Sequence, residues 1–75
     1  MPHIGVKLLQ GKTEKQKKEL AQALIKAAQE VIGFGDESYS ISIEDFTFEE
    51  WKNNVYPNDI MGRKDILFKK PGYEM

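Results

Sequence analysis

Two short segments with strand periodicity lie on either side of a long helical segment, and this order constrains the fold more than any other feature. Residues His3–Leu9 alternate between apolar and other side chains, which predicts a half-buried β-strand. Residues 38–44 alternate in the same way and predict a second strand. The apolar positions are Ile4, Val6 and Leu8 in the first run and Tyr39, Ile41 and Ile43 in the second.

The segment between the two runs has the period of an amphipathic helix. Thr13 and Gln16 have the spacing of a capping box, which predicts a helix over about Glu14–Ile32. Gly33 and Gly35 are suited to the positive φ angle that ends a helix. A strand, a helix and a strand in this order predict one βαβ unit with parallel strands.

The last third of the chain gives weaker signals. Thr47 is placed to cap a short helix that reaches Val55, and we expect Pro57 to interrupt it. Residues 59–70 fit either a second short helix or a short strand at residues 66–68. The choice between these two stays open at this point.

The short length predicts one domain over residues 1–75 that does not complete its core alone. The chain has 75 residues, no cysteine and one histidine. A domain of this size buries a small core, and neither disulfides nor a zinc site with several cysteine or histidine ligands is available to reinforce it. We therefore expect a homo-oligomer.

Charge and hydropathy exclude several classes of partner. The formal net charge is −1, so we expect no general attraction to nucleic acid or to an anionic membrane. No apolar run approaches the roughly 18 residues of a membrane span, and no secretory signal precedes the first strand. We expect a cytoplasmic protein.

Pro2 is the first candidate for chemistry. Removal of Met1 leaves Pro2 with a secondary amine on a rigid ring at the start of the first strand. An ordinary α-amino group has a pKa of about 7.7–8.0, and burial or a neighbouring cation such as Lys12 lowers it. Such an amine is a suitable general base for proton transfer next to a carbonyl group.

The arrangement of these features resembles the 4-oxalocrotonate tautomerase family. The resemblance rests on Pro2 before a short strand, on residues 11–17 at the entry of the helix, and on residues 40–43 in the second strand. The tail, with Trp51 and residues 69–73, is similar to a dimeric branch of that superfamily active on phenylpyruvate-like enols. The implied fold is α+β, a βαβ tautomerase-type fold with a short helical or irregular tail, in which two units form a four-stranded sheet in a dimer.

The resemblance also implies roles for particular residues. Pro2 matches the catalytic proline, and Lys12 falls where the best-known members bind the substrate carboxylate with an arginine. Ser40 falls at a second arginine of those members, so a monocarboxylate is expected in place of a dicarboxylate. Trp51 matches a pocket aromatic, and Arg63 is a candidate second cation.

The implied activity is enol–keto tautomerisation of a small 2-oxo acid such as phenylenolpyruvate, with neither cofactor nor metal. Purely structural roles are also open for two of these residues: Lys12 also fits a solvated loop lysine, and Trp51 also fits a core or interface anchor. For His3 we expect a structural hydrogen bond. Two other functions stay open: a hydratase, dehalogenase or decarboxylase of the same superfamily, for which Glu44 or Asp45 would supply carboxylates, and a non-catalytic oligomeric module.

Overall fold

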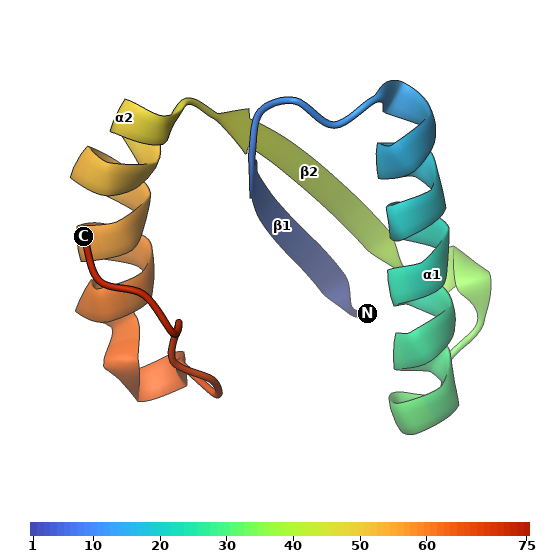
Figure 1. The fold of residues 1–75 in the computed structure, drawn as a ribbon. Coiled ribbons are helices and arrows are strands. Elements are labelled where there is room, and N and C mark those ends of the chain that lie inside the picture. The colour runs from blue at the N-terminus through green and yellow to red at the C-terminus, as the bar shows by residue number, and fades with distance from the viewer. The chain divides into compact units, whose positions relative to one another are not determined.

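The computed structural model describes all residues from Met1 to Met75. The chain divides into two compact units, residues 1–45 and residues 46–75, and each is described by itself. That the two units act as the single domain expected from the sequence stays a prediction. The elements in chain order are β1 (His3–Leu9), α1 (Glu14–Ile32), the 3-10 turn η1 (Asp36–Ser38), β2 (Ser40–Phe46), α2 (Phe48–Glu50), η2 (Trp51–Ile60) and η3 (Met61–Ile66) (Figure 1).

The first unit is the βαβ arrangement expected from the periodicity. β1 and β2 pair in a two-stranded sheet. The amide of Ser40 donates a hydrogen bond to the carbonyl oxygen of Pro2 at 3.2 Å, and further along the same strands Lys7 and Glu44 form an ion pair at 3.9 Å. Since residue numbers rise in the same direction on both strands, the strands are parallel.

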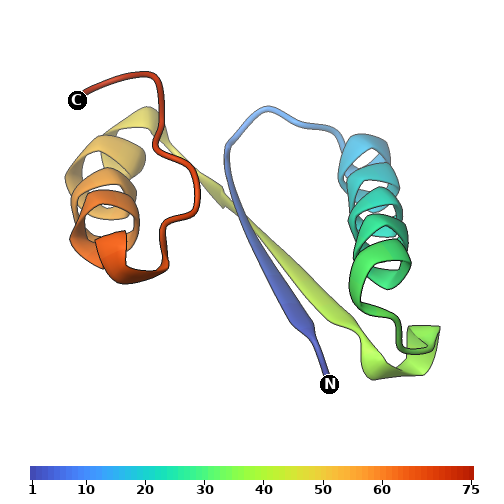
Figure 2. The same ribbon diagram turned by 90° about the horizontal axis from the view of Figure 1, so that it is seen from below.

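Helix α1 covers the apolar face of this sheet, as Figure 2 shows from below (Figure 2). Along β1, the even-numbered residues are half-buried and the odd-numbered ones are exposed. Leu8 lines a small cavity with Leu20 of the helix, and Ile41 and Ile43 of β2 line another with Ala21. The opposite face of the sheet carries the polar side chains of both strands.

Local interactions fix both ends of α1. The Thr13 hydroxyl accepts a hydrogen bond from the Gln16 amide at 3.0 Å, and the Gln16 side chain accepts one from the Thr13 amide at 2.9 Å, which is the predicted capping box. After the helix, Gly33 has a φ of 83° and Phe34 a φ of 70°, whereas Gly35 has a φ of −74°. The expectation of a positive φ was therefore right for Gly33 and wrong for Gly35.

The second unit begins with a helical segment that runs through Pro57 up to Ile60, so the expected interruption at Pro57 was wrong. Thr47 and Glu50 form a second capping box, after which the chain continues through Pro57 as a π-helix up to Ile60. In a π-helix the backbone hydrogen bonds join residues five positions apart, and Pro57, which has no N–H group, donates none of them. A tighter 3-10 turn follows, where a side chain on Gly62 would lie 2.8 Å from the Pro57 carbonyl oxygen.

Residues 67–75 form an irregular tail, so neither a helix up to Lys70 nor a strand at 66–68 is present. Very little of the chain is fully buried: Val55, 1% exposed, is the only such side chain. Large apolar side chains such as Val31, 83% exposed, remain open to solvent. A single chain therefore has the small core expected from its length. None of its helices is long and apolar enough to cross a membrane.

Candidate functional site

Pro2 stands immediately before β1, and its backbone is held by β2. Its ring is half-buried, and its carbonyl oxygen accepts the hydrogen bond from Ser40. Met1, by contrast, is fully exposed, which leaves the Met1–Pro2 peptide bond accessible to an aminopeptidase. While Met1 is attached, the Pro2 nitrogen is an amide and has no basicity. Removal of Met1 turns it into a secondary amine.

His3 links the strands beside Pro2 on the exposed face of the sheet. Its Nδ1 atom lies 2.7 Å from the Ser40 hydroxyl oxygen, and its Nε2 atom lies 3.4 Å from the Ser42 hydroxyl oxygen. Both ring nitrogens are thus engaged by β2. The expected structural hydrogen bond of His3 is confirmed, and the Ser40 hydroxyl holds the imidazole ring.

Lys12 lies at the opposite end of β1 from Pro2. It is exposed in the loop before α1 and lines a cavity of about 190 Å³ with Leu8, Gln16, Lys17 and Leu20. The seven residues of β1 separate it from Pro2, which at about 3.3 Å per residue is a span on the order of 20 Å. A lysine side chain does not bridge that span. The structure therefore brings Pro2 and Ser40 together in one chain, but not Pro2 and Lys12.

Trp51 and Arg63 belong to the second unit. The Trp51 indole is half-buried and meets Phe46 edge to face, with ring centroids 6.2 Å apart at 77°. Its Nε1 atom donates a hydrogen bond to the Tyr73 hydroxyl at 3.0 Å. The Arg63 side chain is 54% exposed and lies 3.4 Å from the Asp65 carboxylate. An ion pair this exposed is weak and leaves the guanidinium available to another partner.

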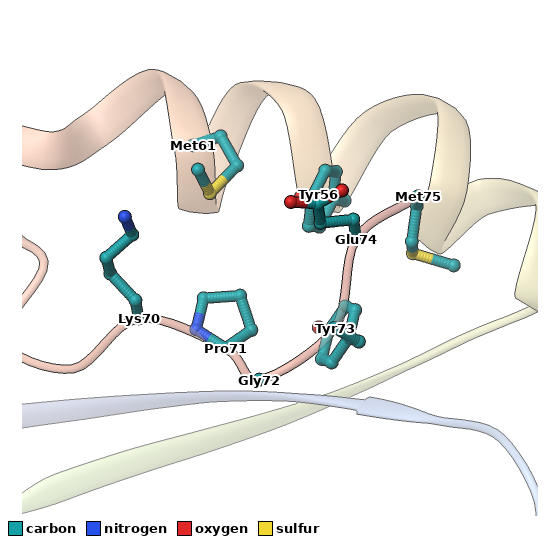
Figure 3. A pocket seen from close by; sticks show the side chains of 8 residues that line it. All are labelled: Tyr56, Met61, Lys70, Pro71, Gly72, Tyr73, Glu74 and Met75. Carbon is teal, nitrogen blue, oxygen red and sulfur yellow. The ribbon is translucent and has the colours of Figure 1, made fainter.

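A cavity that the sequence did not predict lies between the helical segment and the tail of the second unit. Its volume is about 390 Å³. Figure 3 shows Tyr56 and Met61 on the helical segment and the tail side chains across from them (Figure 3). The lining residues are Tyr56, Met61, Lys70, Pro71, Gly72, Tyr73, Glu74 and Met75. The only sequence signal for it was the Pro71–Gly72 turn before an aromatic residue.

The carboxylates considered for hydration or dehalogenation have lysine partners. Glu44 pairs with Lys7 at 3.9 Å, and Asp45 accepts a hydrogen bond from Lys17 at 2.8 Å. The hydrogen bond to Asp45, helped by one to Glu14, raises the pKa of Lys17 above its ordinary value of 10.5. No cluster of three or more histidine, cysteine or acidic side chains that could hold a metal ion is present.

Comparison with known proteins decides the family. Residues 2–55 match the family described as "Tautomerase enzyme". The chain belongs to the tautomerase family. This tautomerase is 37% identical over 73 residues to a "Probable tautomerase" of Xylella fastidiosa, covering 97% of this chain and 89% of that protein. It is 36% identical over 74 residues to "Tautomerase PptA" of Pectobacterium carotovorum, covering 97% of both, and 33% identical over 76 residues to "Tautomerase PptA" of Cronobacter sakazakii, covering both entirely.

Solved structures of tautomerase homologues share the fold. TomN, described as a 4-oxalocrotonate tautomerase homologue of a tomaymycin biosynthetic pathway, superposes with a TM-score of 0.66 at 30% identity, covering 77% of this chain and 94% of TomN. YwhB, another homologue of 4-oxalocrotonate tautomerase, gives a TM-score of 0.59 at 33% identity, covering 61% and 75%. The α+β fold built on one βαβ unit is confirmed.

Family membership settles the class of reaction. The protein is an enzyme, an isomerase of the tautomerase type, and the family resemblance inferred from the residues is confirmed. The non-catalytic alternative is thereby set aside. The family match begins at Pro2 and ends at Val55, whereas the alignments with the PptA relatives extend over nearly the whole chain and so include the tail.

Proposed function

We propose that this tautomerase converts the enol form of a 2-oxo monocarboxylic acid, such as phenylenolpyruvate, into its keto form. After Met1 is removed, the Pro2 nitrogen takes the proton of the enol hydroxyl. The oxygen electrons form the carbonyl group, and the double-bond electrons take up a proton at C3 from the protonated proline. One proton moves from oxygen to carbon, so the reaction balances without cofactor or metal.

The position of Pro2 carries this proposal. The ring heads β1, its carbonyl is bound by β2, and the residue before it is fully exposed. A base that is fixed by the backbone of two strands does not need to be oriented when substrate arrives, which favours proton transfer.

The residue types at the positions to which the resemblance assigns substrate contacts favour a monocarboxylate with an aromatic group. Ser40, at the position of an arginine in the best-known members, is neutral and is bound to His3. Lys12 supplies one ammonium group for one carboxylate, as a point charge without the fork of arginine. Trp51 offers an indole face for the substrate ring.

The separation of Lys12 from Pro2 leads us to propose that the site is shared between copies of the chain. The lysine that binds a carboxylate beside Pro2 would come from a partner chain, and Arg63 of a partner would serve as a second cation. We propose a homodimer in which two βαβ units form one four-stranded sheet. A cytoplasmic location stays a prediction.

Ketonisation of freshly prepared phenylenolpyruvate, followed by the decay of its ultraviolet absorbance, tests the proposal. The protein is first shown by mass spectrometry to begin at Pro2. We expect decay well above the buffer rate, and a rate that rises with pH through the pKa of the amine. The matched control carries a glutamate inserted between Met1 and Pro2, which blocks removal of Met1, and should be folded but inactive. Equal rates with and without the insertion would exclude Pro2 as the base.

The hydratase, dehalogenase and decarboxylase alternatives receive no specific support. They call for free carboxylates or extra arginines beside the proline. Asp45 accepts a hydrogen bond from Lys17 at 2.8 Å, and the exposed Glu44 is in a weak ion pair with Lys7 at 3.9 Å; neither carboxylate is shown beside Pro2.

A further inference from the structure

We propose that Tyr73 is a positioning residue, which holds the Trp51 indole in the orientation that receives the aromatic ring of the substrate. The inference rests on the proposed function in one respect, because it takes Trp51 as a wall of the substrate site. Neither the family pattern over residues 2–55 nor the names of the relatives assign a role to Tyr73.

The hydrogen bond between the two side chains is the first observation. The indole N–H is the only polar group of tryptophan and can only donate. Here it donates to the Tyr73 hydroxyl at 3.0 Å, across 22 positions of the chain. Trp51 is half-buried and Tyr73 is 45% exposed, so this bond restricts the orientation of the indole from the open side of the ring.

Aromatic contacts of both Trp51 and Tyr73 restrict the orientation of the two rings further. Phe46 meets the indole edge to face at 77°, so Trp51 is held by an aromatic ring as well as by the hydrogen bond. Tyr73 in turn packs on Tyr56, with centroids 5.7 Å apart and an angle of 37° between the rings. The four rings of Phe46, Trp51, Tyr73 and Tyr56 thus form a continuous series that ties the tail to the helical segment.

The tail therefore contributes to substrate selection without contacting the reacting atoms. A fixed indole presents one face for stacking. An indole that samples several rotamers must lose conformational entropy when the substrate binds, and this cost weakens the binding. The effect of Tyr73 should appear only for substrates that carry an aromatic ring. It should leave proton transfer at Pro2 unchanged.

Fluorescence of the single tryptophan tests the contact itself. Trp51 is the only tryptophan of the chain, so its emission reports this site alone. We compare Tyr73→Phe with Tyr56→Phe: each removes one hydroxyl from a ring of the same pair, but only the Tyr73 hydroxyl accepts the indole hydrogen bond. We expect a shifted emission maximum and stronger acrylamide quenching in Tyr73→Phe, and wild-type values in Tyr56→Phe. Wild-type emission and quenching in both variants would overturn the proposal.

Kinetics test the positioning role. With phenylenolpyruvate we expect Tyr73→Phe to raise KM roughly two- to tenfold, the range of one neutral hydrogen bond, with kcat nearly unchanged. With enolpyruvate, released in situ by a phosphatase and lacking the ring, KM should equal that of the wild type. An equal loss with both substrates would mean a merely structural role and would overturn the proposal, as would no loss with either. Circular dichroism and thermal melting of both variants show whether the fold is kept.

The experiments distinguish a failure of the proposed function from a failure of the positioning role of Tyr73. If the wild-type protein does not ketonise either enol, the proposed function fails, while the fluorescence comparison still decides the Trp51–Tyr73 contact. Binding of phenylpyruvate, the keto form, is then followed through quenching of Trp51. A dissociation constant raised in Tyr73→Phe but not in Tyr56→Phe supports the positioning role without any turnover, and equal constants overturn it.

Discussion

The amide of Ser40 donates a hydrogen bond of 3.2 Å to the carbonyl oxygen of Pro2, so the residue before β1 is fixed by the backbone of β2. Neither group belongs to a side chain. Substitutions at either position therefore keep this link, and the chemistry of the Pro2 amine can be changed while its place in the sheet is preserved.

Pro2→Ala should remove most of the enol–keto tautomerase activity without unfolding the protein. Alanine leaves a primary amine that rotates freely, and we expect the rate to fall by roughly a hundredfold or more, as when a positioned general base is lost. Ketonisation of phenylenolpyruvate measures the loss, and circular dichroism checks the fold. Unchanged activity would refute the mechanism.

Lys12→Met should weaken binding of the substrate carboxylate. Loss of a hydrogen bond to a charged group is expected to raise KM roughly ten- to a hundredfold, while Lys12→Arg keeps a low KM. Lys15→Met is the matched control, since Lys15 is an exposed lysine in the first turn of α1. Equal KM values for Lys12→Met and Lys15→Met would show that Lys12 is a solvated loop residue.

Mixing the two impaired variants Pro2→Ala and Lys12→Met should restore activity if the site is shared. In a dimer of Pro2→Ala with Lys12→Met, one site combines the intact Pro2 of one chain with the intact Lys12 of the other. After random exchange of equal amounts, about a quarter of wild-type activity should return in a two-fold symmetric dimer. The two variants are co-refolded and assayed at low substrate concentration. A mixture no more active than the average of its parents would refute a site that combines Pro2 of one chain with Lys12 of another.

Ser40→Arg should shift the preference toward dicarboxylate enols. A second cation near Pro2 pairs with a second carboxylate, and we expect the ratio of kcat/KM for a dicarboxylate over a monocarboxylate enol to rise about tenfold or more. Ser42→Arg, two residues further along the same exposed face of β2, is the control. A similar ratio in both variants would argue against a substrate contact at position 40.

Thr13→Ala should destabilise the first unit by about 1 kcal/mol, because it leaves an amide at the start of α1 without its acceptor. Thr13→Ser keeps the hydroxyl and should unfold close to the wild-type urea concentration. Urea unfolding is compared at one fixed protein concentration, because assembly adds to stability. A midpoint for Thr13→Ala equal to that of the wild type would mean that the capping box contributes nothing.

The ion pair of Lys17 should make stability sensitive to alkali. Its hydrogen bond to Asp45 raises the pKa of Lys17 above 10.5 in the folded state. The stabilisation is therefore fully present below that value and is lost as the pH rises through the raised pKa. The difference in urea midpoint between wild type and Lys17→Met should shrink as the pH rises above 10.5. Lys18→Met, which removes the neighbouring lysine, should show no such change with pH; an equal trend in both would contradict the assignment.

The sequence predicted best what is encoded locally. The alternation of β1, the period of α1 and the capping box of Thr13 depend on residues a few positions apart and were confirmed. The second strand was predicted over residues 38–44 but runs over Ser40–Phe46, because the chain first makes a 3-10 turn at Asp36–Ser38. The path through Pro57 was missed because proline ordinarily interrupts a helix, and no local pattern in the sequence signals the π-type hydrogen bonding that is present.

The candidate site shows the same limit. The chemical type of Pro2, Lys12 and Trp51 is readable from the chain, but their mutual placement is not. The predicted strand His3–Leu9 already separates Lys12 from Pro2 within one chain, but no local pattern tells which residues a partner chain would bring beside Pro2. The bond from Trp51 to Tyr73 joins segments 22 positions apart and leaves no periodic signal.

The scarcity of buried side chains has a consequence for how the enzyme behaves in dilute solution. One chain fully buries a single side chain, Val55, so in the proposed dimer association would add to the free energy of folding. Folding, assembly and completion of the proposed shared site would then be coupled and would depend on protein concentration. Specific activity would fall on dilution and recover on concentration, and a substrate that bridges two copies would itself promote assembly.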